Sequence, residues 1–179
     1  LDINSRLVSY LPRYAPLASK FSMILNLRDK IPGLAKISEI LFGFTAKREL
    51  PKWRKDYFKN SELPDSIDKN SDKTPVILFV DTFNRYYEPE NVRSAINVLK
   101  STGYFPFIPK TTKKNKQLCC GRTFLSNGLV EEAKIEAENI LATFYPYLEN
   151  GISVVGLEPS CILSFRDELP SLIQTNHAQ

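Results

Sequence analysis

Three cysteines carry most of the chemical information in this sequence. Cys119 and Cys120 are adjacent and precede Gly121, while Cys161 lies much further along the chain. Three thiolates together with one oxygen ligand suit a soft metal centre, either Zn or an iron–sulfur cluster. An odd number of cysteines argues against a disulfide framework, and adjacent cysteines rarely bond to each other without strain. We therefore expect reduced cysteines in a cytosolic setting.

The single histidine, His177, stands close to the end of the 179-residue chain. A hydrolase built on a Cys–His or Ser–His pair would depend on this residue. A chain end is a poor place to hold a catalytic base, because terminal residues are seldom tied down. The sequence therefore disfavours these classes of hydrolase.

Charge and hydropathy exclude two further classes. The formal net charge is +4, and residues 1–74 carry 14 Lys and Arg against 9 Asp and Glu. This basic excess is scattered among acids, so we expect no dedicated nucleic-acid surface. No apolar run approaches the roughly 18 residues that a membrane span needs, so we expect a soluble protein.

The second part of the chain predicts an α/β fold, a small parallel sheet with helices on both faces. Three apolar runs predict strands, at 75–81, 104–110 and 152–159, and a brief strand is expected at the start of 117–122. Helices are predicted between Pro89 and Gly103, over 129–151, and after Cys161 to about Leu169. The stretch 82–91 is turn-like, and 111–116 predicts a basic surface loop.

The first part predicts a helical arm over residues 1–50. Prolines at 12, 16 and 32 end or kink its segments, and a second helix is expected over 34–41, with Gly43 near its end. The apolar face of such an arm must pack on something.

Residues 51–74 are polar and rich in charge, which predicts a linker or surface excursion with Trp53, Tyr57 and Phe58 as anchors. We therefore divide the chain into an arm (1–50), a linker (51–74) and an α/β domain (75–179).

Polar and sulfur-bearing residues follow several strands of the predicted sheet. They are Asp81 and Thr82 after the first strand, Cys119 and Cys120 before Gly121, and Glu158, Ser160 and Cys161 after the last strand. Ligands of open α/β sheets bind beyond the carboxyl ends of the strands. The sequence therefore predicts a metal site there, with Cys119, Cys120, Cys161 and Asp81 as ligands.

Neighbouring residues could support such a site. Arg85, Arg122 and nearby helix N-termini would offset the negative charge of thiolates, and Gly121 would let the chain turn its N–H groups toward sulfur. Simpler roles stay open for all of these residues. The cysteines suit a buried core, Asp81 and Glu158 suit helix caps, and the two arginines suit surface ion pairs.

Three stretches together resemble a known family. VDTFNRYYEPEN (80–91), LCCGRTFLSNGLVEEA (118–133) and VVGLEPSCILSFRDEL (154–169) resemble the cysteine-rich CCG domain of FAD-linked oxidoreductases. These are enzymes of the D-lactate, glycolate and D-2-hydroxyglutarate dehydrogenase type, and the heterodisulfide-reductase B subunit shares the repeat. The segment GFTAKRELPKW (43–53) is similar to the one that joins a ferredoxin-like module to the first repeat. The resemblance implies a Rossmann-like repeat with an iron–sulfur cluster of the 4Fe-4S kind.

The chain departs from the family pattern at its first ligand. Thr82 of DTFNR occupies the position where relatives have a cysteine before an Asn-Arg pair, here Asn84 and Arg85. The final cysteine, Cys161, is single. A flavin-binding domain, a ferredoxin cysteine run and a second repeat are absent. Since the sequence opens on Leu1 without a leader pattern, we expect a fragment of a longer chain.

The resemblance implies that FAD and the oxidation of a 2-hydroxy acid belong to other parts of the enzyme, and that this fragment alone is not catalytic. It implies flavin and ferredoxin-like domains of the same polypeptide as partners, with a homo-oligomer as a further option. It implies a cytoplasmic enzyme, or one that associates with the membrane through its electron acceptor.

Three functions stay open. The first is electron transfer through a cysteine-bound centre in a FAD-linked 2-hydroxyacid dehydrogenase. The second is a docking domain of the same enzyme that has lost its cluster. The third is thiol chemistry like that of heterodisulfide reductase, with Cys120 at a helix start, where its pKa would fall.

Overall fold

The computed structural model describes residues 1–68, 70–111 and 117–173. Within them, β1 (Thr74–Phe79), β2 (Tyr104–Phe107) and β3 (Ser153–Gly156) form one parallel sheet in the order β2-β1-β3. The central strand pairs Ile77 with Phe107 on one side and with Val154 on the other. The predicted α/β class with a parallel sheet is confirmed.

The central position of β1 follows from its composition. Its residues from Val76 to Phe79 are all buried, and such an unbroken apolar run is typical of a parallel strand covered on both faces. β2 carries Pro106 and lies at the edge of the sheet, as predicted, because proline cannot donate a ladder hydrogen bond.

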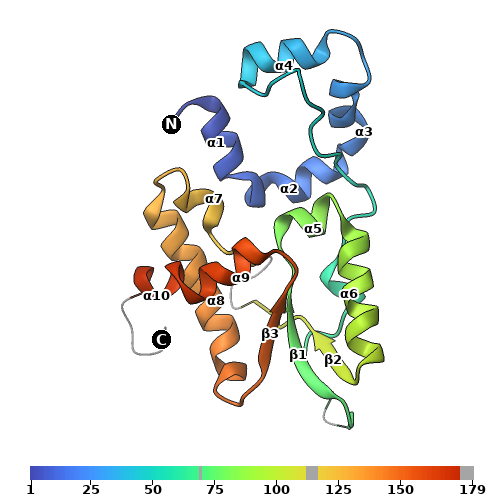
Figure 1. Ribbon diagram of the computed structural model, residues 1–179, viewed down its shortest axis with the longest axis vertical. Coiled ribbons are helices and arrows are strands. Elements are labelled where there is room, and N and C mark those ends of the chain that lie inside the picture. The colour runs from blue at the N-terminus through green and yellow to red at the C-terminus, as the bar shows by residue number, and fades with distance from the viewer. Residues whose placement is uncertain (69, 112–116, 174–179) are drawn as a thin grey trace.

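Helices cover both faces of the sheet, as predicted (Figure 1). On one face α6 (Pro89–Ser101) packs Val92 and Ile96 against Leu78. On the other face α8 (Val130–Leu148) packs Ala137 against Ile77, with α9 (Pro159–Arg166) and α10 (Glu168–Leu172) beside it. Neighbouring residues of β1 serve opposite faces because side chains alternate along a strand.

Local predictions fail at the loops beyond the strands. The turn-like stretch contains a helix, α5 (Thr82–Tyr86), because Asp81 caps its first N–H groups. The brief strand expected at 117–122 is wrong, since residues 117–120 pair with no strand and lead into α7 (Arg122–Leu125). The last long helix begins at Pro159 rather than after Cys161. Residues 112–116 of the predicted basic loop, and His177, lie outside the described residues.

The arm lies beyond the carboxyl edge of the sheet (Figure 1). It consists of α1 (Ile3–Ser9), α2 (Leu11–Lys20), α3 (Ser22–Leu25), the 3-10 helix η1 (Asn26–Asp29) and α4 (Leu34–Phe42). As predicted, α4 ends at Gly43. The arm buries mostly small residues such as Ala15, Ala18 and Ser19, while many of its large apolar side chains stay exposed. None of the helices in the described ranges is long and apolar enough to cross a membrane.

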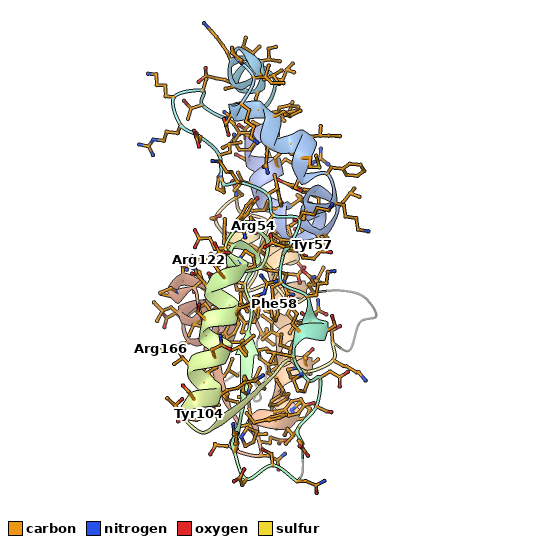
Figure 2. The ribbon with its side chains drawn as sticks, turned by 90° about the vertical axis from the view of Figure 1, so that its right-hand side faces the viewer. Arg54, Tyr57, Phe58, Tyr104, Arg122 and Arg166 are labelled. Atoms are coloured by element: carbon orange, nitrogen blue, oxygen red, sulfur yellow. The ribbon has the colours of Figure 1, made fainter. Side chains whose placement is uncertain are left out.

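The segment 51–74 contributes to the core as well as to the surface. Phe58 is fully buried, and together with Leu63 it packs in the same apolar cluster as Val92 of α6. The short helix η2 (Asn60–Glu62) lies between them. Figure 2 shows this segment running past α6, with Arg54 and Tyr57 near the end of α6 that faces the arm.

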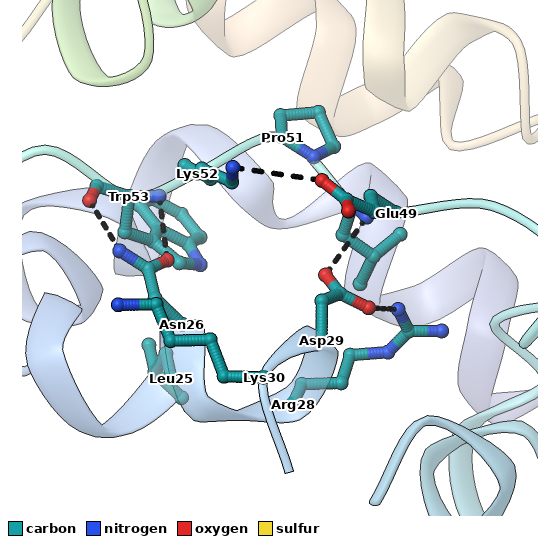
Figure 3. A pocket seen from close by; sticks show the side chains of 10 residues that line it. Leu25, Asn26, Arg28, Asp29, Lys30, Glu49, Pro51, Lys52 and Trp53 are labelled. Carbon is teal, nitrogen blue, oxygen red and sulfur yellow. Dashed lines mark hydrogen bonds and ion pairs between the residues drawn. The ribbon is translucent and has the colours of Figure 1, made fainter. Parts of the chain in front are cut away.

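A clasp of polar side chains fastens η1 to the connector that follows α4 (Figure 3). The Asn26 side-chain amide donates to the carbonyl of Trp53 (2.8 Å) and accepts from its N–H (2.9 Å). Asp29 accepts from the N–H of Leu50 and pairs with Arg28. The notch between these residues measures about 80 Å³, and its polar groups are largely used by one another. We therefore interpret this notch as a structural feature of the arm.

Candidate functional site

The structure brings the three cysteines together beyond the carboxyl edge of the sheet. The sulfurs of Cys120 and Cys161 lie 3.0 Å apart and share a hydrogen bond, and Cys119 is hydrogen-bonded to Cys120 as well. None of the three is in a disulfide, and each has 6–7% of its surface exposed. The predicted convergence of these sequence-distant residues is therefore present.

Gly121 sets the conformation of the cysteine loop. Its φ of +78° is a left-handed conformation that glycine adopts without strain. Its N–H donates to the sulfur of Cys119 over 3.4 Å. A Cβ at this position would lie 3.1 Å from the carbonyl oxygen of Ala133 on α8, so the loop lies directly on that helix.

Cys161 is held by the first turn of α9. The Glu158 carboxylate caps this helix, accepting from the N–H (3.3 Å) and the hydroxyl (2.8 Å) of Ser160. Glu158 therefore serves as a helix cap, the simpler of its two expected roles, and Ser160 is the residue whose groups it accepts from. The cap fixes where Cys161 stands relative to Cys120.

Hydrogen bonding divides the charge unequally among the three sulfurs. Hydrogen bonds from Cys119 and Cys161 lower the pKa of Cys120 to about 3. The same bonds, together with burial, raise the pKa values of Cys119 and Cys161 well above the usual thiol range. Of the three sulfurs, Cys120 is therefore the one that most readily carries a negative charge.

Asp81 is committed to α5. Its carboxylate accepts the N–H of Phe83 (2.9 Å), the N–H of Asn84 (3.0 Å) and the side-chain amide of Asn84 (2.7 Å). It is buried, and its charge is near enough to contribute to the raised pKa of Cys161. Asp81 is therefore a helix cap, which is the simpler of the two roles expected for it. Thr82 is the first residue of the capped helix.

The side chains of the two arginines contact groups other than the cysteines, although the backbone N–H of Arg122 donates a hydrogen bond to Cys120. Arg85 is 4% exposed, donates to the carbonyl of Phe58 (3.2 Å) and the side chain of Asn60 (2.7 Å), and lies over the Phe58 ring. Burial lowers its pKa from the usual arginine value. Arg122 pairs with Glu168 near the surface. Both therefore fasten neighbouring segments, and Arg122 has the simpler role of a surface ion pair.

Sequence reasoning missed Glu136. This residue of α8 is 2% exposed, and its Cβ lies 3.5 Å from where a Cβ on Gly121 would stand. Its charge contributes to the raised pKa of Cys119, and Arg13 of the arm approaches it to 3.6 Å. A signal was present, because Glu136 falls at helical spacing from the predicted apolar positions Ala133 and Ile140.

The donors at this site match a soft metal in kind but are too few for a full ligand set. Among the described residues, no group of three or more His, Cys, Asp or Glu side chains is arranged to hold a metal ion. Two sulfurs on one tetrahedral zinc would lie about 3.8 Å apart at Zn–S distances of about 2.3 Å. The 3.0 Å pair would have to open, and the Asp81 oxygens are already bonded. The described residues thus do not form a complete coordination shell.

Comparison with known proteins supports a relationship to an oxidoreductase. The chain is 21% identical over 177 residues to one subunit of the anaerobic glycerol-3-phosphate dehydrogenase of Escherichia coli strain K12, and equally to the same subunit of E. coli O157:H7. The alignment covers 98% of this chain and 43% of each relative, so the chain spans less than half the length of the curated relatives it matches. No model of a known protein family matches the chain. No solved structure matches it either.

Proposed function

We propose that this chain is a cysteine-rich electron-transfer module of a dehydrogenase. The observation that carries the proposal is the convergence of Cys119, Cys120 and Cys161 at the ligand-binding edge of a parallel sheet. The similarity to a dehydrogenase subunit, over nearly the whole chain, supports the same assignment.

In this proposal the cysteines supply thiolate ligands, and further ligands come from outside the described residues. An iron–sulfur centre, when bound, would supply one-electron transfer. The chain keeps the ligands in a buried setting, because the turn at Gly121 and the α9 cap fix the two cysteine segments. Glu136 and Asp81 add negative charge nearby, and Arg13 offsets the first of them.

The finer assignment rests on the motifs. The CCG-type stretches point to a FAD-linked enzyme for a 2-hydroxy acid, with FAD, a flavin domain and a ferredoxin-like domain elsewhere in the same assembly. The relatives' name supports a dehydrogenase with more than one subunit. We therefore propose a partner subunit or domain that exchanges electrons with the cysteine site.

Metal analysis tests this proposal most directly. The protein is purified without oxygen and its iron, zinc and acid-labile sulfide are measured, with an absorption spectrum. Iron and sulfide in similar amounts are expected, and Cys120→Ser and Cys161→Ser should each lose them. Ser164→Ala, a buried change on the same helix as Cys161, is the matched control and should retain them.

The incomplete ligand set favours one alternative, a docking domain without a centre. Thr82 stands at the family's first cysteine position, and Asp81 serves a helix cap. If all variants and the native chain lack iron, and Cys120→Ser leaves assembly with the rest of the enzyme intact, this alternative replaces the electron-transfer proposal. Zinc alone in the protein would indicate a structural site.

A further inference from the structure

The short contact between Cys120 and Cys161 has a consequence that goes beyond electron transfer. Their sulfurs lie 3.0 Å apart, whereas a disulfide bond needs about 2.05 Å. An approach of about 1 Å would therefore join them. The two residues lie in one apolar cluster and come from different elements, the loop before α7 and the first turn of α9.

We propose that Cys120 and Cys161 form a dithiol site that a small organic disulfide oxidises to an intramolecular disulfide. The bond would tie the cysteine loop to α9. It would also consume two of the three sulfurs available to a metal, so that oxidation and metal binding exclude each other. The site thus has a protected, metal-free state as well as a metal-binding one.

The choice of partners follows from geometry. Cys119 and Cys120 are neighbours in the chain, and a disulfide between adjacent residues is strained. The Cys119 sulfur is also held by the N–H of Gly121. Cys161 approaches Cys120 from a separate helix and needs no such distortion. Cys119 is therefore the thiol that should remain free.

The reaction balances through two thiol–disulfide exchanges. The sulfur of one cysteine attacks the organic disulfide, forms a mixed disulfide and releases one organic thiol. The second cysteine then attacks the protein sulfur of that mixed disulfide and releases the second organic thiol. The protein loses two electrons and two protons, both of which end on the organic thiols.

Burial limits the oxidant to a small molecule. Cys120 and Cys161 expose only 6% and 7% of their surface. A compact reagent such as hydroxyethyl disulfide therefore suits the test better than a bulky one. A mixed disulfide that persisted on the protein would need space beside the sulfur for the organic group. We therefore expect the intramolecular disulfide to form in preference.

The experiment uses the full chain, reduced and freed of metal, and incubated with hydroxyethyl disulfide. Remaining thiols are then alkylated in denaturant, and the protein is measured by intact mass and peptide mapping. The expected product has one alkylated residue, Cys119, and a peptide that links Cys120 with Cys161. Dithiothreitol should restore three alkylated cysteines.

Two variants sharpen the result. Cys119→Ser should form the same link at a similar rate, whereas Cys161→Ser should lose it. Circular dichroism confirms that each variant is folded. A Cys119–Cys120 link, a lasting mixed adduct in the native chain, or dimers joined by disulfides would each overturn the proposal.

This result is separable from that of the metal analysis. Iron in the anaerobic protein without the link in the metal-free protein would sustain electron transfer and refute the dithiol site. Formation of the Cys120–Cys161 disulfide in a protein that contains no iron under any condition would support the dithiol site and refute electron transfer.

Discussion

At the scale of single residues, Gly121 should be hard to replace. An alanine there would adopt a strained φ of +78° and place its Cβ 3.1 Å from the Ala133 carbonyl oxygen. We expect Gly121→Ala to lower the free energy of unfolding by about 2–3 kcal/mol in urea titrations. Gly128→Ala is the control, because Gly128 has a similar φ of +75° but open space around it, and it should cost about 1 kcal/mol. Equal losses would show that contact with α8 does not matter.

Asp81 offers a test of its role as cap or ligand. Asp81→Ala removes three hydrogen bonds at the start of α5 and should lower the free energy of unfolding by about 1–2 kcal/mol. A cap has no direct bond to a metal, so the iron content per folded molecule should stay unchanged. Loss of iron at unaltered stability would instead make Asp81 a ligand.

At the scale of elements, an ion pair joins the arm to the sheet's helices. Arg13 of α2 lies 3.6 Å from Glu136 of α8 and over the ring of Phe124 in α7. Arg13→Met leaves the buried Glu136 carboxylate without this cation, so we expect a loss of about 1–3 kcal/mol in the free energy of unfolding. Adding Glu136→Gln should recover part of it, since the two changes act on one interaction. Lys20→Met, at the exposed end of α2, is the control, and strictly additive effects would contradict the coupling.

A second ion pair joins η2 to α6 and makes stability depend on pH. The hydrogen bond from Arg93 (2.8 Å) lowers the pKa of Glu62 below its usual value of 4.5. The pair therefore stabilises the fold above about pH 4.5, and this contribution is lost as pH falls through the lowered pKa. Glu62→Gln should cost about 0.2–1 kcal/mol at pH 7 and less at pH 3. Unfolding of both proteins at the two pH values measures this, and an equal cost at both would contradict it.

Elements with a clear apolar pattern were predictable, and the contacts between them were not. β1 was predictable from its apolar run, and α8 from the helical spacing of its apolar residues. The end of α4 was predictable from Gly43. The cap at α5 had a signal in the sequence, an aspartate directly before the helix, yet the stretch 82–91 was expected to be turn-like. Residues 117–120 look apolar enough for a strand but find no partner in the sheet.

Some features of the candidate site could likewise be predicted from the sequence, and others could not. Cys161 could be placed at the carboxyl edge because it follows β3, and parallel strands end at one edge. Cys119 and Cys120 reach the same edge through a loop, and not through the brief strand expected there. Which sulfurs touch, the commitment of Asp81 to a cap, and the approach of Arg13 to Glu136 depend on tertiary packing. Residues 13 and 136 are too far apart in the chain for any local pattern to relate them.

At the scale of the whole molecule, burial is uneven. The sheet and its helices enclose two apolar clusters, one on each face of β1. At the far end of the arm, α4 and η1 contain no buried residue, and Ile37, Ile40 and Leu41 are exposed. Elements with so few buried contacts open at low cost, whereas a central strand opens only when the whole domain unfolds.

Hydrogen exchange should therefore separate the molecule into two levels of protection. We expect amides of β1 to exchange only through global unfolding, and those of α4 to exchange through local opening with a much smaller free energy. Mass spectrometry of peptides from the native chain measures both, and α2, which is tied to α5 and α8, should fall between them. Equal protection of α4 and β1 would show that the arm belongs to one cooperative unit. If α4 becomes protected when this chain forms part of a longer protein, its exposed apolar residues are the surface that the remaining chain covers.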